Sequence, residues 1–596
     1  MMLVCAQSEG SARIMRQALR SALQLAALVL FLAGTAVPAL AGPEQDRRDC
    51  ARGVIQACTR IIEGRRESKK TLSTAYNIRG SAYAGKGQYE RAIADLDQAI
   101  KLDPKDALAY ANRGIAYFKK GQYERAIADL DQAIKLDPKN ALAYTNRGSA
   151  YEDKAQYERA IADFDQAIKL NPNFAMAFYN RGSAYDDKGQ YERAIADYDR
   201  AIKLDPNFAR AYNNRGNAYQ KTGHLDYAIA DFDKAIKLNP NYVLAYNNRG
   251  AAYKDKGQYE RAIADYDQAI ELDPKFAGAY YNRGIAYQKT GHLDHAIADL
   301  DQAIKLDPKV ALAYANRGSA YFEKGKYERA IADYDQAIKL NPKLAPAYNN
   351  RGIAYLRKRQ QDRAIGDYDQ AIKLNPNYAG AYYNRGNAYG EKGQYERAIA
   401  DYDQAIELDP KFAGAYYNRG IAYQKTGHLD HAIGDYDRAI KLDPKDAFAY
   451  ANRGSAYFEK GKYERAIADF DQAIKLNPKD AGAYINRGIA YGKKGKYERA
   501  IADFDQTIKL DPKNAVVYAT RGLVYSGKGQ YERAIADFDQ AIKINPKFAV
   551  TYAIRGLAYE LKGEKKRAIA DYRKAIELFP GLQMATEGLK RLGATP

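Results

Sequence analysis

The sequence predicts an all-α solenoid of tandem helix–turn–helix repeats, and two observations carry that prediction. Residues 73–582 divide into 15 consecutive segments of 34 residues without an insertion. Within each segment, apolar residues recur every three or four positions, which is the period of a helix face. Because such segments stack on their neighbours, a chain of 596 residues needs no large single core.

Each segment is long enough for two helices. We number positions within a repeat from 1 to 34 and use the second repeat, 107–140, as the example. Positions 1 to about 14 predict a helix A, and positions 17 to about 30 predict a helix B. Gly121 at position 15 suits the left-handed residue that ends a helix, and Pro138 at position 32 cannot continue helix B. The small residues Gly114 and Ala126 indicate that the two helices cross closely.

The segments that flank the repeats also predict short helices. Residues 42–72 look like a degenerate helix pair, with 54–62 in the place of a helix B. In the tail at 583–596, Ala585, Leu589 and Leu592 are spaced four and three apart, as on one face of a final helix. We expect both segments to cap the ends of the solenoid.

Two cysteines, Cys50 and Cys58, lie in the N-terminal helix pair. On one straight helix they would lie about 12 Å apart, which is too far for a bridge. Gly53 lies between them and can end one helix before the next begins. We therefore expect a disulfide that pins this pair, as suits an exported chain. Two free thiols or a metal site are the alternatives, and a metal would lack further ligands nearby.

Residues 1–41 have the pattern of a secretory signal peptide. A stretch with three arginines precedes an apolar run at 22–34, and Ala39-Leu40-Ala41 forms a small-x-small cleavage site. The apolar run is short for a membrane span, and an uncleaved anchor is the alternative. We expect cleavage after Ala41, a mature chain without a membrane span, and a periplasmic or secreted protein.

The charge of the chain, +19, is spread evenly along the repeats. Lysines recur at the same few repeat positions and alternate with aspartate and glutamate. Nucleic-acid-binding proteins instead gather basic residues on one face. We expect a solvated surface with a basic excess and no nucleic-acid partner.

The repeat has small or aromatic residues at positions 4, 8, 11, 20, 24 and 27 and proline at position 32. The position-8 glycine and the position-32 proline occur in all 15 segments, from Gly80 to Gly556 and from Pro104 to Pro580. This pattern resembles the tetratricopeptide repeat family. The resemblance implies a right-handed superhelix, with helix A on the concave face and helix B on the convex face.

One position departs from that family's pattern. The family usually has leucine at position 7, but all 15 repeats here have arginine, from Arg79 to Arg555. Aspartate occupies position 23 in all 15 repeats, from Asp95 to Asp571. Because a buried arginine without a partner is costly, we expect a ladder of partly buried ion pairs. An arginine row for anionic ligands is the alternative.

No group of residues predicts catalysis. The five histidines stand at positions 16 or 19, at the start of helix B: His224, His292, His295, His428 and His431. Two His-x-x-His pairs among them have a spacing that can hold a metal, but only Asp294 and Asp430 accompany them, so we expect plain surface residues. No glycine-rich phosphate loop follows a strand. We therefore predict no enzyme, no cofactor and no metal.

An uninterrupted row of asparagines marks the expected concave face. Position 6 is asparagine in repeats 2 to 13: Asn112, Asn146, Asn180, Asn214, Asn248, Asn282, Asn316, Asn350, Asn384, Asn418, Asn452 and Asn486. An amide both donates and accepts, so such a row can bind the backbone of an extended peptide whatever its sequence. It resembles the asparagine ladder with which a member of the family holds peptide backbone. One alternative is that the amides only bond neighbouring backbone. The other is that the asparagine was copied along when the repeats were duplicated.

Aromatic residues at positions 5 and 12 vary between repeats, and we expect them to offer apolar pockets and specificity in the groove: Phe118, Tyr179, Tyr281, Phe322, Tyr383, Tyr417 and Phe458. The family's carboxylate clamp draws lysines from positions 2 and 5. This chain has no lysine at either position, so a C-terminal acidic peptide is not the expected ligand.

Together these patterns predict a non-enzymatic scaffold that binds extended segments of a protein or peptide partner in its concave groove. The alternative is a structural spacer that joins partners through its ends or its convex face. Self-association is compatible with both.

Overall fold

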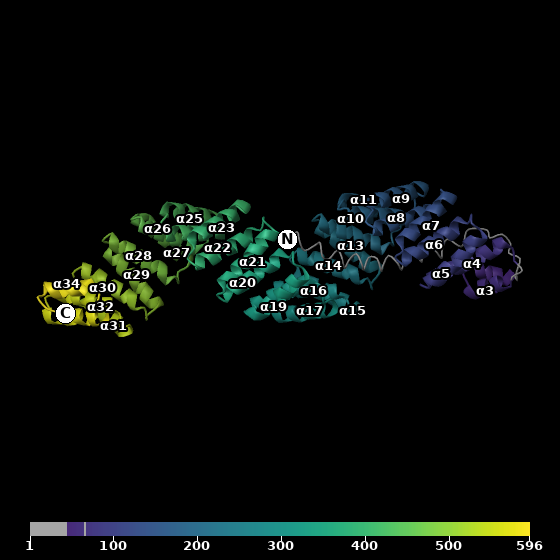
Figure 1. Cartoon of the computed structure of the whole chain (residues 1–596). Coiled ribbons are helices and arrows are strands. Elements are labelled where there is room, and N and C mark those ends of the chain that lie inside the picture. The colour runs from purple at the N-terminus through teal and green to yellow at the C-terminus, as the bar shows by residue number, and fades with distance from the viewer. Residues whose placement is uncertain (1–43, 65–66, 596) are drawn as a thin grey trace. The chain divides into compact units, whose positions relative to one another are not determined.

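The computed structural model describes residues 44–64 and 67–595 (Figure 1). The predicted signal peptide at 1–41, with its cleavage site after Ala41, lies outside these residues. The described residues form 33 α-helices and no β-strand, so the all-α prediction of tandem helix pairs is confirmed.

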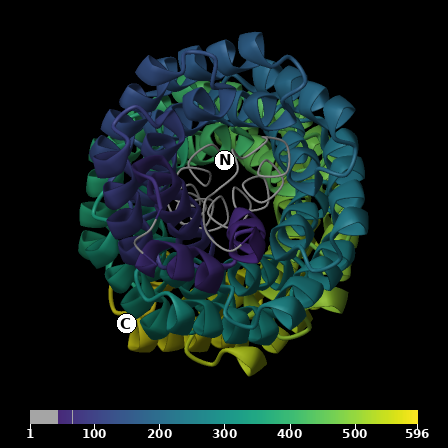
Figure 2. The ribbon, with the colours of Figure 1, turned by 90° about the vertical axis from the view of Figure 1, so that its right-hand side faces the viewer.

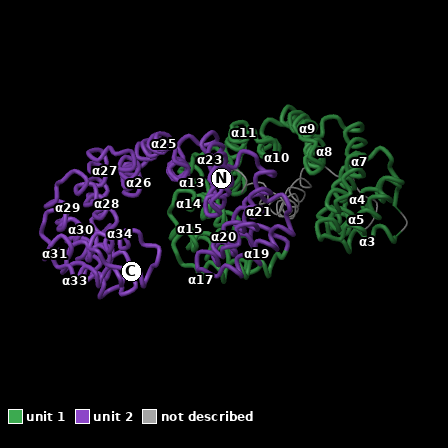
Figure 3. Tube along the Cα trace, turned by 60° about the vertical axis from the view of Figure 1, so that its left-hand side comes forward, with its two compact units in different colours: residues 1–308 green, residues 309–596 purple. Residues whose placement is uncertain are grey.

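The chain divides into two compact units, residues 1–308 and 309–596 (Figure 3). Unit 1 contains the N-terminal helix pair and repeats 1–7. Its helices are α2 (Glu44–Ala51), α3 (Ile55–Glu63), α4 (Lys69–Gly85), α5 (Tyr89–Leu102), α6 (Ala107–Lys119), α7 (Tyr123–Leu136), α8 (Ala141–Asp153), α9 (Tyr157–Leu170), α10 (Ala175–Asp187), α11 (Tyr191–Leu204), α12 (Ala209–Lys221), α13 (Leu225–Leu238), α14 (Val243–Asp255), α15 (Tyr259–Leu272), α16 (Ala277–Lys289) and α17 (Leu293–Leu306).

Unit 2 contains repeats 8–15 and a final helix. Its helices are α18 (Ala311–Glu323), α19 (Tyr327–Leu340), α20 (Ala345–Arg357), α21 (Gln361–Leu374), α22 (Ala379–Glu391), α23 (Tyr395–Leu408), α24 (Ala413–Lys425), α25 (Leu429–Leu442), α26 (Ala447–Glu459), α27 (Tyr463–Leu476), α28 (Ala481–Lys493), α29 (Tyr497–Leu510), α30 (Ala515–Gly527), α31 (Tyr531–Ile544), α32 (Ala549–Leu561), α33 (Lys565–Leu578) and α34 (Gln583–Arg591).

A short turn with one left-handed residue separates helix A from helix B in each repeat. In the second repeat, helix A has 13 residues, helix B has 14, and Gly121 between them has φ 72°. Ala155 and Arg359 hold the same conformation without being glycine, at φ 57° and 58°. The turn therefore keeps its backbone in repeats 3 and 9, where the glycine is missing, although an alanine or arginine adopts it less readily.

The two helices of a repeat touch where helix A has its glycine. A Cβ atom on Gly386 of α22 would lie 2.7 Å from the ring of Tyr402, at position 24 of α23. Ala398, at position 20 of α23, is also fully buried. The position-8 glycine is thus a requirement of close packing, because any side chain there would enter the neighbouring ring.

Within each unit the even-numbered helices follow the inner side of the curve. In unit 1, α8 and α10 lie inside α9 and α11; in unit 2, α26, α28 and α30 lie inside α25, α27, α29 and α31 (Figure 3). Even-numbered helices of successive repeats also contact one another; for example, α22 contacts α24. The curve of unit 1 is visible from its end in Figure 2, from purple to teal. Side chains of helix A that neither helix B nor a neighbouring even-numbered helix covers can therefore line an inner surface.

The ends of the array differ from its repeats. The chain turns between α2 and α3 at Gly53, whose φ is 82°, and Cys50 and Cys58 form a disulfide with Cα atoms 4.7 Å apart. At the other end, Ala585 and Leu589 of α34 are fully buried against the last repeat. Among the described helices, none combines the length and the apolar character that crossing a membrane requires.

Candidate functional site

The position-7 arginine of every repeat binds the position-23 aspartate of the same repeat. In repeat 10, Nε and Nη2 of Arg385 donate to the two carboxylate oxygens of Asp401, at 2.8 and 2.6 Å. The same paired bonds recur in all 15 repeats, from Arg79 with Asp95 to Arg555 with Asp571. The predicted ladder of ion pairs is confirmed, and its two-bond geometry suits the planar guanidinium.

A second aspartate, at position 25, links nearly every repeat to the next, and the sequence analysis missed it. Nη1 of Arg385 donates to Asp369 of the preceding repeat at 2.5 Å. A signal was present: position 25 is aspartate in the first 14 repeats and arginine, Arg573, in the last. Arg573 is followed by the final helix α34 and not by another position-7 arginine, and it donates to the carbonyl oxygen of Thr595.

Aromatic rings enclose the guanidinium groups. That of Arg419 lies 5.6 Å from the ring centre of Tyr416 and 5.9 Å from that of Tyr423, at positions 4 and 11. The bond to Asp401 raises the pKa of Arg385 above its usual value. Burial raises the pKa of Asp401, against the opposing effect of Arg385.

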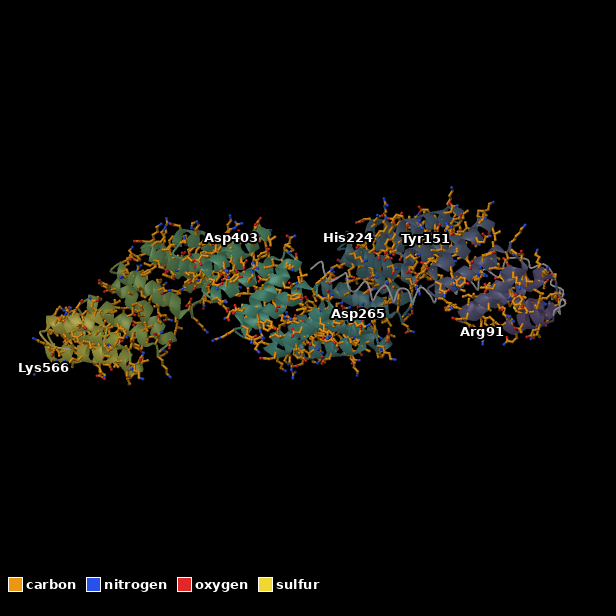
Figure 4. All side chains as sticks on the ribbon, viewed as in Figure 1. Arg91, Tyr151, His224, Asp265, Asp403 and Lys566 are labelled. Atoms are coloured by element: carbon orange, nitrogen blue, oxygen red, sulfur yellow. A yellow bond between two sulfur atoms is a disulfide. The ribbon has the colours of Figure 1, made fainter. Side chains whose placement is uncertain are left out.

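Since the pairs take up the nitrogens of these arginines, the geometry favours an internal framework over a row of anion-binding sites. Asp265 and Asp403, labelled in Figure 4, belong to this framework on α15 and α23.

The asparagine row lies on the even-numbered helices, and its amide groups bond mostly to side chains of the preceding repeat. Nδ2 of Asn384 donates to Oδ1 of Asn349 at 3.0 Å, and Nδ2 of Asn452 donates to the Tyr417 hydroxyl at 2.8 Å. In each case the acceptor stands at position 5, one repeat earlier. The same bond is made by Asn112, Asn214, Asn248, Asn282 and Asn418.

The other five asparagines of the row are placed differently. Asn180 donates to Ser149 at 3.3 Å, and Asn350 accepts from Asn349 at 3.1 Å. Asn146 is buried, and Asn316 and Asn486 are half-buried. The acceptors of these seven bonds between repeats are side chains and not backbone. The alternative that the amides bond neighbouring backbone therefore does not describe them.

Five amides of the row are fixed on one side only. In Asn112, Asn282, Asn384, Asn418 and Asn452 the Nδ2 group is bonded, while no donor within the described residues reaches Oδ1. All five side chains are half-buried. A row of oriented carbonyl oxygens can accept hydrogen bonds from the N–H groups of a bound chain.

The predicted groove aromatics pack against their own chain. Phe118 and Tyr179 are buried, and the rings of Phe322 and Phe458 lie 5.3 Å from Tyr327 and Tyr463. The others are half-buried: Tyr281, Tyr383 and Tyr417. The hydroxyls of Tyr179, Tyr383 and Tyr417 accept from the asparagine row. These rings therefore support the row, and their apolar faces are largely occupied from within.

The histidines lie on the exposed surface, as His224 does in Figure 4. The ring centres of His292 and His295 are 6.2 Å apart, and those of His428 and His431 are equally spaced. Within residues 44–64 and 67–595, no three or more histidine, cysteine, aspartate or glutamate side chains form a group that could hold a metal ion.

Comparison with protein families gives matches along nearly the whole array. A model described as "TPR repeat" matches residues 80–121, 114–155, 182–223, 252–291, 318–358, 360–393, 386–427 and 454–495. Three models described as "Tetratricopeptide repeat" match 141–174, 209–242, 277–310, 413–446, 481–514 and 515–548; 164–196, 232–264, 300–332 and 435–468; and 549–581. No curated protein matches the chain.

Several solved structures are similar to parts of the chain. MamA is 32% identical over 28% of this chain and 96% of its own, with a TM-score of 0.26. YrrB, a TPR protein with an unusual peptide-binding site, is 29% identical over 31% and 95%, with a TM-score of 0.27. The Cut9–Hcn1 structure is 18% identical over 82% and 96%, with a TM-score of 0.42.

Proposed function

Because the chain belongs to the tetratricopeptide repeat family, we propose that it binds an extended segment of a partner protein along its inner helices. Repeats of this family are typical of proteins that act as scaffolds for protein–protein interaction. The observation that carries the finer proposal is the run of half-buried amides in three successive repeats, Asn384, Asn418 and Asn452, each anchored through Nδ2 with Oδ1 left for a ligand. Catalysis plays no part in this proposal.

The spacing of the row suits an extended chain. Neighbouring packed helices lie about 8–10 Å apart, and an extended peptide advances about 3.3 Å per residue. One carbonyl oxygen of the row can therefore accept from the backbone of roughly every third ligand residue. Since the contact is to backbone, it selects an extended conformation, and side-chain contacts at positions 2, 9, 12 and 13 select the sequence.

The test is to replace Asn384, Asn418 and Asn452 together by alanine, all within unit 2. The probe is a peptide selected from a random library on the wild-type protein. We expect an affinity loss of at least about tenfold, since three hydrogen bonds each contribute about 0.5–1.5 kcal/mol. The matched control replaces three amides of the odd-numbered helices by alanine: Gln370, Gln404 and Gln472. Equal binding by the asparagine variant and the control would rule out the row as the ligand site.

A structural spacer is the second candidate, and the ion pairs between successive repeats favour it. Arg385 reaches Asp369, and Lys392 reaches Asp362, each in the preceding repeat. Deleting residues 379–514, a block of four repeats, separates the two functions. A groove binder loses affinity for the probe peptide, because the deletion removes Asn384, Asn418 and Asn452, whereas a spacer changes an assembly whose geometry depends on length.

We also propose that the protein is exported and that its mature form begins at Gly42. The pattern of residues 1–41 supports this, and so does the Cys50–Cys58 disulfide, because such bonds persist in oxidising compartments. Mass spectrometry of the chain recovered outside the cytoplasm should find Gly42 as its first residue. Recovery of the chain from the cytoplasm with residues 1–41 intact would contradict the proposal.

A further inference from the structure

Exposed apolar side chains gather at the C-terminal end of the array. The described residues contain twelve large apolar side chains that are well exposed, and seven of them lie between residues 510 and 584: Leu510, Val516, Leu523, Val550, Leu561, Phe579 and Met584. A concentration of this kind on a soluble protein marks an interaction surface more often than scattered single residues do.

Three of these side chains form a row. Val516 and Val550 stand at position 2 of α30 and α32, and Met584 holds the equivalent place in α34, so successive members are 34 residues apart. They are 54%, 42% and 41% exposed. The helix α32 contacts both α30 and α34, so the row crosses three adjacent helices.

Two leucines widen the row into a surface. Leu523 follows Val516 by seven residues and Leu561 follows Val550 by eleven, which are two and three helical turns, so each pair shares a helix face. We call Val516, Leu523, Val550, Leu561 and Met584 the apolar row. It begins where the asparagine row has ended.

Basic side chains outnumber acidic ones around the apolar row. Lys513 and Lys547, in the loops that lead into α30 and α32, are exposed, as is Lys493 at the end of α28. Along α30 and α32 the only acidic residue is Glu560, which already binds Arg591 and Tyr572. Two carboxylates are also exposed nearby, Asp511 in the loop before α30 and Glu587 three residues after Met584 in α34. A ligand for this surface therefore meets apolar side chains and an excess of lysines over carboxylates.

We propose that the apolar row binds an acidic segment of a partner protein in the extended polyproline II conformation, whose three residues per turn present an apolar side chain on one face at every third residue. This inference rests on the proposed function, since it assigns a partner chemistry to one part of the same inner surface. Complementary charge favours an acidic partner. A second copy of this chain, with a net charge of +19, would bring lysines against lysines.

The probe is a synthetic peptide of about twelve residues, with leucine at every third position, aspartates between and one tryptophan. Because the protein contains no tryptophan, the fluorescence of the peptide reports binding directly. Two control peptides replace the aspartates by lysine or the leucines by serine. We expect the acidic peptide to bind at least about tenfold more tightly than either control, and the preference over the lysine peptide to fall with added salt.

The protein variant replaces Val516, Val550 and Met584 together by serine. These side chains are exposed, so the helical signal and its melting should not change, while the affinity for the acidic peptide falls at least about tenfold through lost apolar contact. The matched control is Leu108→Ser, another exposed position-2 residue, in repeat 2. A second variant, Lys513→Gln with Lys547→Gln, should reduce the preference for aspartate over lysine.

The outcomes separate this inference from the proposed function. The variant of Asn384, Asn418 and Asn452 should leave binding of the acidic peptide unchanged. Unchanged binding by the serine variant overturns the apolar row as a site, whatever the asparagine variant does to its own peptide. Equal affinity for the aspartate and lysine peptides overturns the acidic partner. Self-association of the wild-type protein that the serine variant abolishes would show that a second copy occupies the row.

Discussion

The contact between the two helices of a repeat is nearly identical along the array, whereas the inner surface of the even-numbered helices differs between repeats 2–13 and repeats 14 and 15. At the contact, each repeat has its glycine, its buried alanine and its Arg–Asp pair. On the inner surface, repeats 2 to 13 carry asparagine at position 6, and repeats 14 and 15 carry Thr520 and Ile554. The glycine and the arginine of the contact belong to the same even-numbered helices as these inner residues.

The difference shows how one helix can serve two purposes. A residue that faces the partner helix is constrained by contacts that every repeat must make, so duplication preserves it. An exposed residue on the inner surface, such as Val516, touches few atoms of its own chain, so its change costs little stability. Specificity can therefore differ along the array, from the asparagine row to the apolar row, while the fold remains the same.

The largest effect should come from breaking an ion pair inside a repeat. Asp435→Ala leaves the half-buried guanidinium of Arg419 without the two bonds it makes at 2.7 Å, and we expect a loss of about 3–5 kcal/mol. Hydrogen exchange of the amides in α24 and α25 measures it locally, which suits an array that need not unfold in one step. The matched change is Asp437→Ala, whose half-exposed carboxylate makes one bond to Arg453; it should cost about 1 kcal/mol or less. Equal losses would refute the distinction.

A smaller effect should follow from crowding the helix contact. Gly386→Val places a side chain against Tyr402, and overpacking of this kind costs about 1–3 kcal/mol. On the same helix, a Cβ atom on Gly390 would meet nothing nearer than the Tyr402 hydroxyl at 3.8 Å. Gly390→Ala should therefore leave stability unchanged or raise it by up to about 1 kcal/mol, since alanine favours helix. Urea unfolding of the two variants compares them, and destabilisation by Gly390→Ala would show that the inner surface is as constrained as the contact.

The smallest effect should come from the outer ion pairs between repeats. Lys494 binds Glu464, whose side chain is largely exposed, and that bond lowers the pKa of the glutamate. A lowered pKa adds stability above the unfolded pKa, and this is lost as the pH falls through the folded pKa. Lys494→Thr, which copies Thr426 at the same position of repeat 11, should lower the melting temperature only slightly at neutral pH. The difference should vanish in acid or in high salt; a difference that persists in both would point to packing.

Several features of the fold could be predicted because they repeat. The 34-residue period indicated helix pairs, and the structure places the helices of repeat 2 at positions 1–13 and 17–30. All 15 repeats have arginine at position 7 and aspartate at position 23, beginning with Arg79 and Asp95. These equal numbers predicted that the two residues pair. The sequence also held a signal for position 25, because its aspartate is replaced only in the last repeat, by Arg573. That signal could be interpreted only once the structure showed that Nη1 of the position-7 arginine points to the preceding repeat.

The candidate site was less predictable, because it depends on directions that a pattern does not contain. Position 6 was placed on helix A, yet its partner at position 5 of the preceding repeat emerged only when successive helices were packed together. Tyr383 and Tyr417 were expected to line pockets, and they lie with their rings against Phe412 and Tyr436. The exposure of Val516 and its neighbours likewise depends on which side of α30 the adjacent helices cover.

The sequence by itself determined the all-helical repeat, the glycine at the helix crossing and the pairing of arginine with aspartate, because each is a local or next-helix contact repeated 15 times. Only the tertiary structure decided which amide oxygens stay unbonded and which apolar side chains stay exposed. Those properties depend on how successive repeats pack, and packing acts between side chains 30 or more residues apart. The period of the sequence gives their spacing along the chain but not the direction in which each side chain points.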